Sequence, residues 1–508
     1  MSPKRILLWL LTCFALALLG SSLLASFNQP QVQGRLELYQ TNLLLVASEW
    51  QGDSTDPSTQ VIQSQILGDN PRTTALEQYR QARDAALKLR QSDPALLQSL
   101  GRNWLEEVTL KQGLLEAVTG DLPSAQTHWQ SLTTGGATSP FSPVAQVLMG
   151  LWADPPQLLP NAESLIQNNL QGWFEVQALE RLYGLQQRSM AQSNLAQSQQ
   201  DAAAVALLKL LVVSGLPLVG GAIGVAVLLG LGVQTWRKGS AFPPLGDPAP
   251  ASTVDTPPGS PPPSPWVVPW DGETTWQVLV VGFFFVGQIV VSQIFAPLLL
   301  LGLQRVPSLT DPAYDLRAKA IYVLLVYFSM ALGVLVVLYG SIKPYLPLPA
   351  GWFRVDWGSS WLAWGIGGYL MALPLVTVTA LVNQQIWQGQ GGSNPILTFA
   401  LENKDTFALG CFFTTAAIAA PLFEEFLFRG FLLASLTRYF SSWGAIALSG
   451  LIFAVAHLSL SEVLPLFVLG MVLGYVYRRS QNLLAPMVLH SLWNSSTLVG
   501  LVVLGTGN

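Results

Sequence analysis

The chain has few of the residues on which many enzyme sites depend. Its 508 residues include only two cysteines, Cys13 and Cys411, and both lie in apolar stretches. They offer neither a disulfide framework nor a cysteine-based zinc site. Charged residues make up 11% of the chain, against about 25% in soluble domains. Half of the residues are hydrophobic, which indicates an integral membrane protein, and the net charge of −4 argues against a nucleic-acid partner.

Two common catalytic motifs are also absent. The sequence contains neither H-E-x-x-H, the helical motif of many zinc proteases, nor G-x-S-x-G, which surrounds the nucleophile of many serine hydrolases. These absences argue against a serine protease. Only three histidines occur, namely His128, His457 and His490. His128 lies beside Trp129 in a polar region, and we expect it to be a surface or packing residue.

Two apolar segments frame the polar N-terminal part of the chain. Residues 1–27 are long enough to form an uncleaved membrane anchor or, alternatively, a signal peptide. Residues 204–238 form a predicted second span. Basic residues at the outer ends of these segments are Lys4, Arg5, Arg237 and Lys238. Because basic flanks stay in the cytoplasm, residues 28–203 between the segments are predicted to be extracytoplasmic.

Residues 28–203 are predicted to form a soluble α-helical domain. Apolar residues recur at helical spacing in Leu96–Val118. Leu114–Leu132 reads as a helix, a Gly-Asp turn and a second helix with Ala125 and Trp129 facing inward. This pattern weakly resembles one hairpin of a tetratricopeptide repeat, although no repeat period of about 34 residues runs through the region. We therefore predict a protein partner for this domain.

A proline-rich stretch leads into a membrane domain. Residues 239–275 contain P-P-G-S-P-P-P-S-P, a composition typical of an extended linker. Residues 276–505 then hold apolar runs at about 276–303, 320–341, 360–383, 407–438, 443–460, 465–478 and 483–505. With the two earlier segments these make nine predicted spans. The predicted fold class is all-α: a polytopic helical membrane bundle with an extracytoplasmic helical domain at its N-terminus.

Charged residues interrupt the apolar run 407–438. Pro421–Gly430 reads P-L-F-E-E-F-L-F-R-G. A charged side chain at membrane depth costs at least about 2.5–3.5 kcal/mol, and it is a functional candidate by default. Glu425 and Arg429 are four residues apart on one helix face and can pair, whereas Glu424 faces about 100° away. A buried structural ion pair would explain Glu425 and Arg429 but not Glu424.

Polar residues interrupt two later spans as well. Leu451–Leu458 reads L-I-F-A-V-A-H-L and includes His457. Met487–Asn494 reads M-V-L-H-S-L-W-N, with His490 and Asn494 on one helix face. A lone histidine in an apolar helix is usually a satisfied core residue. Three polar insertions in separate spans instead favour a shared site.

The depths of two of these residues agree. The chain is expected to turn near Ser441, about 17 residues after Glu424 and about 16 before His457, so each lies roughly 24 Å from the turn. If the two helices are antiparallel neighbours, Glu424 and His457 lie level with each other. The sequence therefore predicts that they face one cavity within the membrane.

Taken together, the three motifs resemble those of a known protease family. E-E-F-L-F-R-G, F-A-V-A-H and H-S-L-W-N match the E-E-x-x-x-R, F-x-x-x-H and H-x-x-x-N motifs of the CAAX protease and bacteriocin-processing (CPBP, or Abi) family. The resemblance covers about 360–505. It implies a membrane-embedded CAAX-type endopeptidase with a protein or peptide substrate in or at the lipid bilayer. Eukaryotic relatives remove the last three residues of prenylated proteins.

Two mechanisms fit the matching residues. In the first, which we prefer, no cofactor is needed: Glu424 and His457 activate water, and His490 and Asn494 stabilise the oxyanion. In the second, Glu424, His457 and His490 form a three-ligand zinc site with one open position. The candidate site residues are Glu424, Glu425, Arg429, His457, His490 and Asn494.

Two other classes of function remain open at this stage. The chain can be a non-proteolytic membrane scaffold or assembly factor that recruits partners through residues 28–203. It can also be a transporter that uses Glu424 as a proton site. Loss of cleavage on substitution of the motif residues separates a peptidase from both, and no substrate is named by the sequence.

Overall fold

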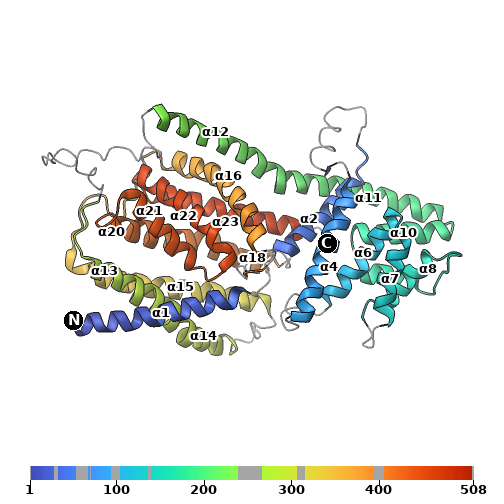
Figure 1. The fold of residues 1–508 in the computed structure, drawn as a ribbon, viewed down its shortest axis with the longest axis horizontal. Coiled ribbons are helices and arrows are strands. Elements are labelled where there is room, and N and C mark those ends of the chain that lie inside the picture. Colours follow the sequence, from blue (N-terminus) through green and yellow to red (C-terminus); the bar gives the residue numbers. More distant parts are fainter. Residues whose placement is uncertain are drawn as a thin grey trace. The chain divides into compact units, whose positions relative to one another are not determined.

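The computed structural model is all-helical: the regular elements in the part of the chain that it describes are helices, and this part contains no sheet (Figure 1). The described residues are 2–27, 33–52, 67–68, 70–92, 103–134, 139–237, 266–305, 315–387, 390–392 and 405–505. The chain divides into two units. The membrane unit comprises Met1–Gln29 and Pro217–Val499, and the N-terminal unit comprises Pro30–Leu216 with Gly500–Asn508.

The N-terminal unit is a helical bundle around one apolar core. Its helices are α2 (Gln33–Ser48), α4 (Pro71–Ser92), α6 (Trp104–Thr119), α7 (Leu122–Thr134), α8 (Ser142–Leu151), α9 (Ala162–Asn169), α10 (Trp173–Leu185) and α11 (Ser189–Leu210). The predicted hairpin is confirmed, since α6 and α7 pack together and bury Ala125 and Trp129 completely. Gly120 ends α6 with φ 98°, a conformation that glycine adopts at little cost.

His128 takes part in the packing of this unit. Its Nδ1 lies 2.7 Å from the Glu116 carboxylate, which also accepts a hydrogen bond from Gln112. Burial opposes ionisation of Glu116, but the hydrogen bonds from His128 and Gln112 outweigh it and lower the pKa of this carboxyl group. The histidine therefore serves to satisfy a buried acid, in line with the expected packing role.

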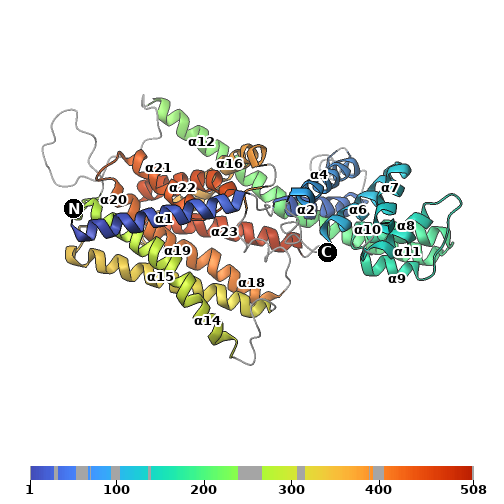
Figure 2. The same cartoon turned by 60° about the horizontal axis from the view of Figure 1, so that its bottom comes forward.

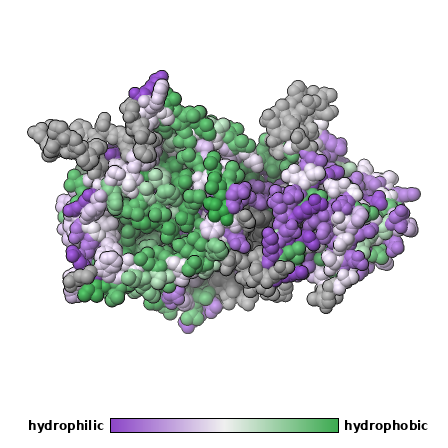
Figure 3. Space-filling model, viewed as in Figure 1, coloured by the Kyte–Doolittle hydropathy of each residue, from purple (hydrophilic) through white to green (hydrophobic). Residues whose placement is uncertain are grey.

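The membrane unit contains the remaining helices. They are α1 (Pro3–Phe27), α12 (Leu216–Arg237), α13, η3 and α14 (together Gly272–Leu303), α15 (Leu316–Ile342), α16 (Trp361–Trp387), α18 to α20 with their π-helical segments (together Thr406–Leu436), α21 (Ser442–Val455), α22 (Leu460–Ser480) and α23 (Leu484–Gly505). Hydrophobic side chains dominate the face of this unit seen in Figure 3, whereas hydrophilic ones dominate that of the N-terminal unit. This is the surface expected of helices that face lipid.

Eight described helices are long and apolar enough to cross a membrane, one fewer than the nine predicted. The difference is α21, which has 14 residues where the sequence suggested a span over 443–460. Such a helix is about 21 Å long, against roughly 30 Å for the hydrocarbon core. The chain leaves α21 at Val455 and begins α22 only at Leu460. Irregular backbone at this depth is tolerated where it lines a cavity, and it does so here.

Contacts of α1 define the two ends of the membrane unit. At its start, Lys4 and Arg5 pair with Glu273 of α13 at 3.1 and 2.7 Å, so both helices begin at one end (Figure 2). Near its finish, the Ser26 hydroxyl accepts a hydrogen bond from the backbone N–H of Leu460, where α22 begins. We refer to these as the Lys4 end and the Ser26 end.

The predicted linker 239–275 ends earlier than the sequence suggested. Residues 238–265 lie outside the described part, but Trp266 and Trp270 are buried. The Trp270 indole N–H donates a hydrogen bond to the Ser435 hydroxyl at 3.0 Å. Large aromatic side chains bury enough apolar surface to hold this segment against the bundle, despite the prolines before it.

Two glycines set the approach of α21 to α22. A Cβ added to Gly470 would lie 2.8 Å from the Gly450 Cα, and one added to Gly450 would lie 3.2 Å from the Gly470 carbonyl carbon. Small residues at a crossing let helix backbones touch. The contact also places the Gly470 carbonyl 3.3 Å from an Arg429 guanidinium nitrogen, which donates to it.

We therefore expect Gly470→Ala to destabilise the protein by about 1–3 kcal/mol, because the new methyl group overlaps backbone that cannot move aside. Thermal unfolding of the purified protein in detergent measures the loss. Gly367→Ala on α16 is the matched control, since nothing lies within 4 Å of its added Cβ. Equal melting temperatures for the two variants would contradict the proposed backbone contact.

Candidate active site

A cavity of about 660 Å³ lies within the membrane unit. Its lining comes from η3, α15, the Thr406–Leu436 helix, the turn between α21 and α22, and both of the last two helices. Four of the predicted site residues line it: Glu424, His457, His490 and Asn494. Glu425 and Arg429 lie behind the lining and are fully buried. The structure thus places all six candidates in one region: four line the cavity, and two are buried behind that lining.

The helix that carries the glutamates is shaped by Pro421. Proline has no backbone N–H, so the turn before Pro421, which contains Ala416 and Ala417, is one backbone donor short. A π-helical segment, η5 (Thr414–Ala419), precedes the proline. Two side chains of α23 replace the missing donor. The Asn494 amide donates to Ala416 at 2.7 Å, and the Ser491 hydroxyl donates to Ala417 at 2.6 Å.

Glu424 faces the cavity and has two unlike carboxylate oxygens. Oε1 accepts a hydrogen bond from the Tyr327 hydroxyl of α15 at 3.0 Å. Oε2 is buried and has no hydrogen-bond partner within the described residues. It lies 4.0 Å from Nε2 of His490, too far for a direct hydrogen bond and a distance at which one water can bridge the two atoms. One oxygen is therefore held in place, and the other is left for chemistry.

Glu425 is the centre of a buried cluster. Its Oε1 accepts hydrogen bonds from the Arg429 guanidinium and from Nδ1 of His490, both at 2.8 Å. Arg429 also lies over the Phe453 ring, with 4.5 Å between guanidinium carbon and ring centroid. Because Nδ1 of His490 is bound to Glu425, its Nε2 is directed toward Glu424. The expected Glu425–Arg429 pair is present and also orients His490.

His457 lies at the end of the short helix α21. Its Nδ1 is 2.9 Å from the Phe453 carbonyl, so this nitrogen carries the proton and Nε2 remains available. The Phe453 ring meets His457 and His490 edge-on, with centroids 4.9 and 5.7 Å apart. Phe453 is thus the apolar spacer that both histidine rings share.

Sequence reasoning missed two residues that hold this site. Tyr327 lies outside the three motifs, in a span that also contains Tyr322 and Tyr339, so no pattern distinguishes it. Ser491 lies inside the third motif at a position the motif leaves open. The missing N–H of Pro421 was the available signal for Ser491, since a freed carbonyl in a membrane needs a donor from a neighbouring helix.

The fit of a metal can be tested on the same residues. Among the described residues, no three His, Cys, Asp or Glu side chains gather closely enough to hold a metal ion. His490 and His457 each bind another group through Nδ1 and keep Nε2 free, which is also usual for metal-ligating histidines, so only the separation of the side chains opposes a metal. We therefore derive the mechanism below from the side chains alone.

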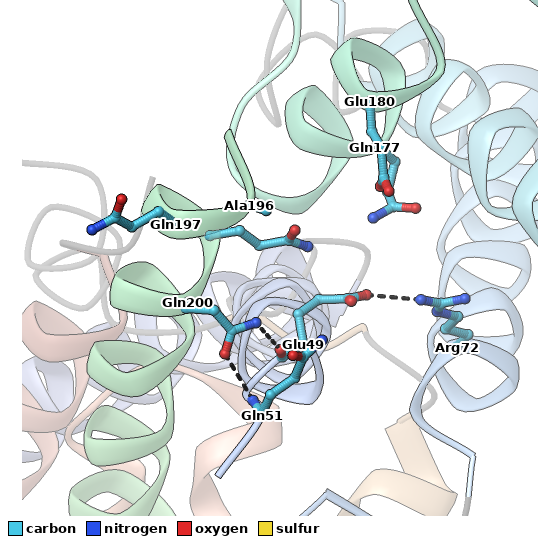
Figure 4. Close-up of a pocket in the computed structure, with 9 residues that line it drawn as sticks. Glu49, Gln51, Arg72, Gln177, Glu180, Ala196, Gln197 and Gln200 are labelled. Carbon is cyan, nitrogen blue, oxygen red and sulfur yellow. Dashed lines mark hydrogen bonds and ion pairs between the residues drawn. The ribbon is translucent and has the colours of Figure 1, made fainter. Parts of the chain in front are cut away.

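A second cavity, of about 540 Å³, lies in the N-terminal unit between α2, α4, α10 and α11 (Figure 4). Its lining is polar and rich in glutamine. The Gln200 side chain accepts a hydrogen bond from the Gln51 backbone N–H at 2.8 Å and donates to the Glu49 carbonyl at 2.7 Å. The Glu49 carboxylate pairs with Arg72. These groups suit contacts with a polypeptide backbone, and the lining residues include neither histidine nor cysteine.

Comparison with known proteins bears on the cavity in the membrane unit. Residues 406–496, which include all six candidate residues, match the family described as type II CAAX prenyl endopeptidase Rce1-like. The chain is also 25% identical over 213 residues to the membrane-embedded CAAX protease MroQ of Staphylococcus aureus (strain USA300), covering 40% of this chain and 83% of that relative. No solved structure matches the chain. The chain is a multi-pass membrane protein, and the part of it that holds the candidate site, residues 406–496, is similar to the Rce1-like (CPBP) family of CAAX-type endopeptidases.

Proposed function

We propose that the chain hydrolyses a peptide bond of a membrane or membrane-associated protein, with Glu424 as the general base. One observation carries the proposal: the unpartnered Oε2 of Glu424 and Nε2 of His490 face each other at 4.0 Å within the cavity. A water between them can lose a proton to Glu424 as its oxygen attacks the substrate carbonyl. The carboxylate is placed to act as the base, and the His490 nitrogen beside it is placed to donate to the oxyanion that forms.

In the proposed reaction, Glu424 accepts a proton from water, and the hydroxide oxygen bonds to the carbonyl carbon. The protonated Glu424 then gives its proton to the amide nitrogen as the carbon–nitrogen bond breaks, which yields a carboxylic acid and an amine; transfer of the acid's proton to the amine leaves a carboxylate and an ammonium group. Tyr327 holds Oε1 by its hydrogen bond, so Oε2 is the oxygen that moves the proton. His457 lines the same cavity and assists in polarising the water.

His490 and Asn494 are the proposed donors to the oxyanion. Glu425 holds the Nδ1 side of the His490 ring, and an Nε2–H on the other side would donate into the cavity. Asn494 uses one amide hydrogen on the Ala416 carbonyl and keeps a second for the oxyanion. Arg429 offsets the charge of Glu425 and keeps its carboxylate in place.

The zinc mechanism and the metal-free mechanism predict different responses to a metal chelator. A zinc-dependent peptidase loses activity when a strong chelator removes the metal, and it recovers when zinc is returned. In the metal-free mechanism the purified protein is insensitive to the chelator.

The N-terminal unit has a proposed role in recruitment. Residues 28–203 would lie outside the cytoplasm, and their polar, glutamine-lined cavity would bind a protein partner or the substrate itself. If the chain instead acts as a scaffold or assembly factor, this unit is its working part and the membrane cavity carries no chemistry. Cleavage that depends on Glu424 separates the two functions.

We expect Glu424→Gln to lower the cleavage rate by at least about a hundredfold, because the amide keeps the shape and loses the base. The measurement is turnover of peptide substrates, including a farnesylated C-a-a-X peptide, by the purified protein in liposomes. The melting temperature should stay near that of the wild type. Normal turnover by this variant would make the glutamate structural and favour the scaffold.

Arg429→Ala serves as the contrasting control. It leaves the buried Glu425 carboxylate without its main counter-charge, which typically costs about 3–5 kcal/mol. This variant should therefore be recovered in much smaller amounts, whereas Glu424→Gln should be recovered in normal amounts.

Tyr327→Phe should reduce kcat roughly tenfold to a hundredfold, the effect of losing a hydrogen bond worth about 1.5–3 kcal/mol to a carboxylate. KM should change little, because the ring and its packing remain. Steady-state kinetics on the best substrate of the wild type measures both constants. A fall in KM and kcat together, or no change in either, would count against a role in orienting Glu424.

A protease site inserted at the exposed turn between Gly120 and Asp121 should be cut by protease added outside intact cells. The reason is that Lys4 and Arg5 in the first turn of α1, and Arg237 at the end of α12, all favour the cytoplasm. The same site inserted within residues 239–265 is the control, and it should be cut only after the membrane is opened. The reverse pattern would overturn both the topology and the recruitment role.

A further inference from the structure

The cavity extends from the glutamates toward one end of the membrane unit. On α22 the lining residues are confined to the first half of the helix, from Glu462 to Leu469. The turn that precedes α22 contributes Ala456 to Ser459. On α23 the lining runs from His490 to Leu498, away from the start of that helix. All three stretches lead toward the Ser26 end, where α22 begins.

The opposite end is closed by buried aromatic side chains, which we call the aromatic floor: Trp266, Trp270, Trp352, Phe431 and Tyr477. The Trp270 ring lies 4.4 Å from that of Trp352 and 5.4 Å from that of Phe431, and Trp266 stacks on Tyr477 at 5.2 Å. The floor continues one apolar core that includes cavity-lining residues. Entry from the Lys4 end would require this core to be unpacked.

Helix pairings assign the remaining segments to the two ends. Phe27 of α1 packs edge-on against Trp387, so α16 finishes at the Ser26 end. Added Cβ atoms on Gly220 and Gly224 of α12 would meet Leu373 and Leu370 of α16, in reversed order along the chain. The two helices are therefore antiparallel, and α12 finishes at the Lys4 end.

Basic residues show which end faces the cytoplasm. Among the described residues, short segments at the Lys4 end carry Lys4, Arg5, Arg237, Lys343, Arg354, Arg438, Arg478 and Arg479, and those at the Ser26 end carry Arg305, Arg317 and Lys319. By the positive-inside rule, the Lys4 end is cytoplasmic. The cavity therefore leads away from the cytoplasm.

We infer that the substrate reaches Glu424 from the extracytoplasmic face, as a peptide segment of a protein exposed there. The identity of the occupant as a substrate rests on the proposed function, whereas the direction of access rests on packing and charge alone. The same face is where the chain leaves α1 for residues 28–203. A C-terminal C-a-a-X segment presented from the cytoplasm is the competing source, and it would meet the aromatic floor.

Cysteine labelling tests the route without any substrate. Thr497 is exposed and lines the cavity, while Tyr439 is exposed near the Lys4 end. Each is replaced by cysteine in the full chain after Cys13→Ser and Cys411→Ala. A membrane-impermeant maleimide added to spheroplasts should label Thr497→Cys at least tenfold faster than Tyr439→Cys. Once the membrane is opened, Tyr439→Cys should label as well.

Labelling of Thr497→Cys only after the membrane is opened, or in neither condition, overturns the inference. The second arm uses a library of reporter peptides fixed to either membrane face by a single-span anchor, with Glu424→Gln as the control. Cleavage only of the extracytoplasmic reporters supports the inference, and cleavage only of the cytoplasmic ones overturns it. If neither set is cleaved but Thr497→Cys labels from outside, the access route stands and the proposed function fails.

Discussion

A fully buried carboxylate within a membrane must be neutralised, and the membrane unit is arranged around the neutralisation of Glu425. Its partners come from two places: Arg429 one turn along the same helix, and His490 on α23. Arg429 in turn reaches the Gly470 carbonyl, which ties α22 to the same point. Removing one partner from such a buried ion pair typically costs several kcal/mol. The contacts of Glu425 and Arg429 therefore hold three helices in one register. Glu424, the adjacent residue, is thereby directed into the cavity.

Pro421 imposes a second constraint on the same helix. It leaves the preceding turn one backbone donor short at membrane depth, and α23 supplies side-chain donors to that turn from Ser491 and Asn494. The residues that hold α23 in place, Ser491 and Asn494, thus lie within about one turn of His490, which serves the site. A proline that would weaken an isolated helix here fixes the position of a neighbouring one. The geometry of the site follows from both constraints together.

The helical period was sufficient to predict some of this arrangement. The spacing of Glu425 and Arg429 predicts their pair, and the equal depths of Glu424 and His457 about the turn near Ser441 predict that both reach one cavity. These are properties of a single helix or of one hairpin. The hydrogen bond from Tyr327 was beyond the sequence, because it depends on how α15 packs against a helix nearly a hundred residues later. The early end of α21 was missed for a related reason: apolar residues continue past Val455, and only the cavity permits the turn.

The aromatic floor is a second feature that the sequence alone did not predict. Its members come from a segment that composition assigned to a linker, from a loop and from two helices, so no local pattern unites them. Their packing gives the cavity a single direction. The fold class and the candidate residues could therefore be read from local patterns, whereas the direction of access and the orientation of Glu424 required the packed bundle.

The central claim is that this chain cleaves proteins through Glu424. Its most direct test is a comparison of protein termini in the membranes of cells that express the wild type or Glu424→Gln at equal levels, by mass spectrometry. The account predicts a set of new termini, from proteins at the extracytoplasmic face, that is present with the wild type and absent with the variant. Identical sets of termini in the two membranes would contradict it.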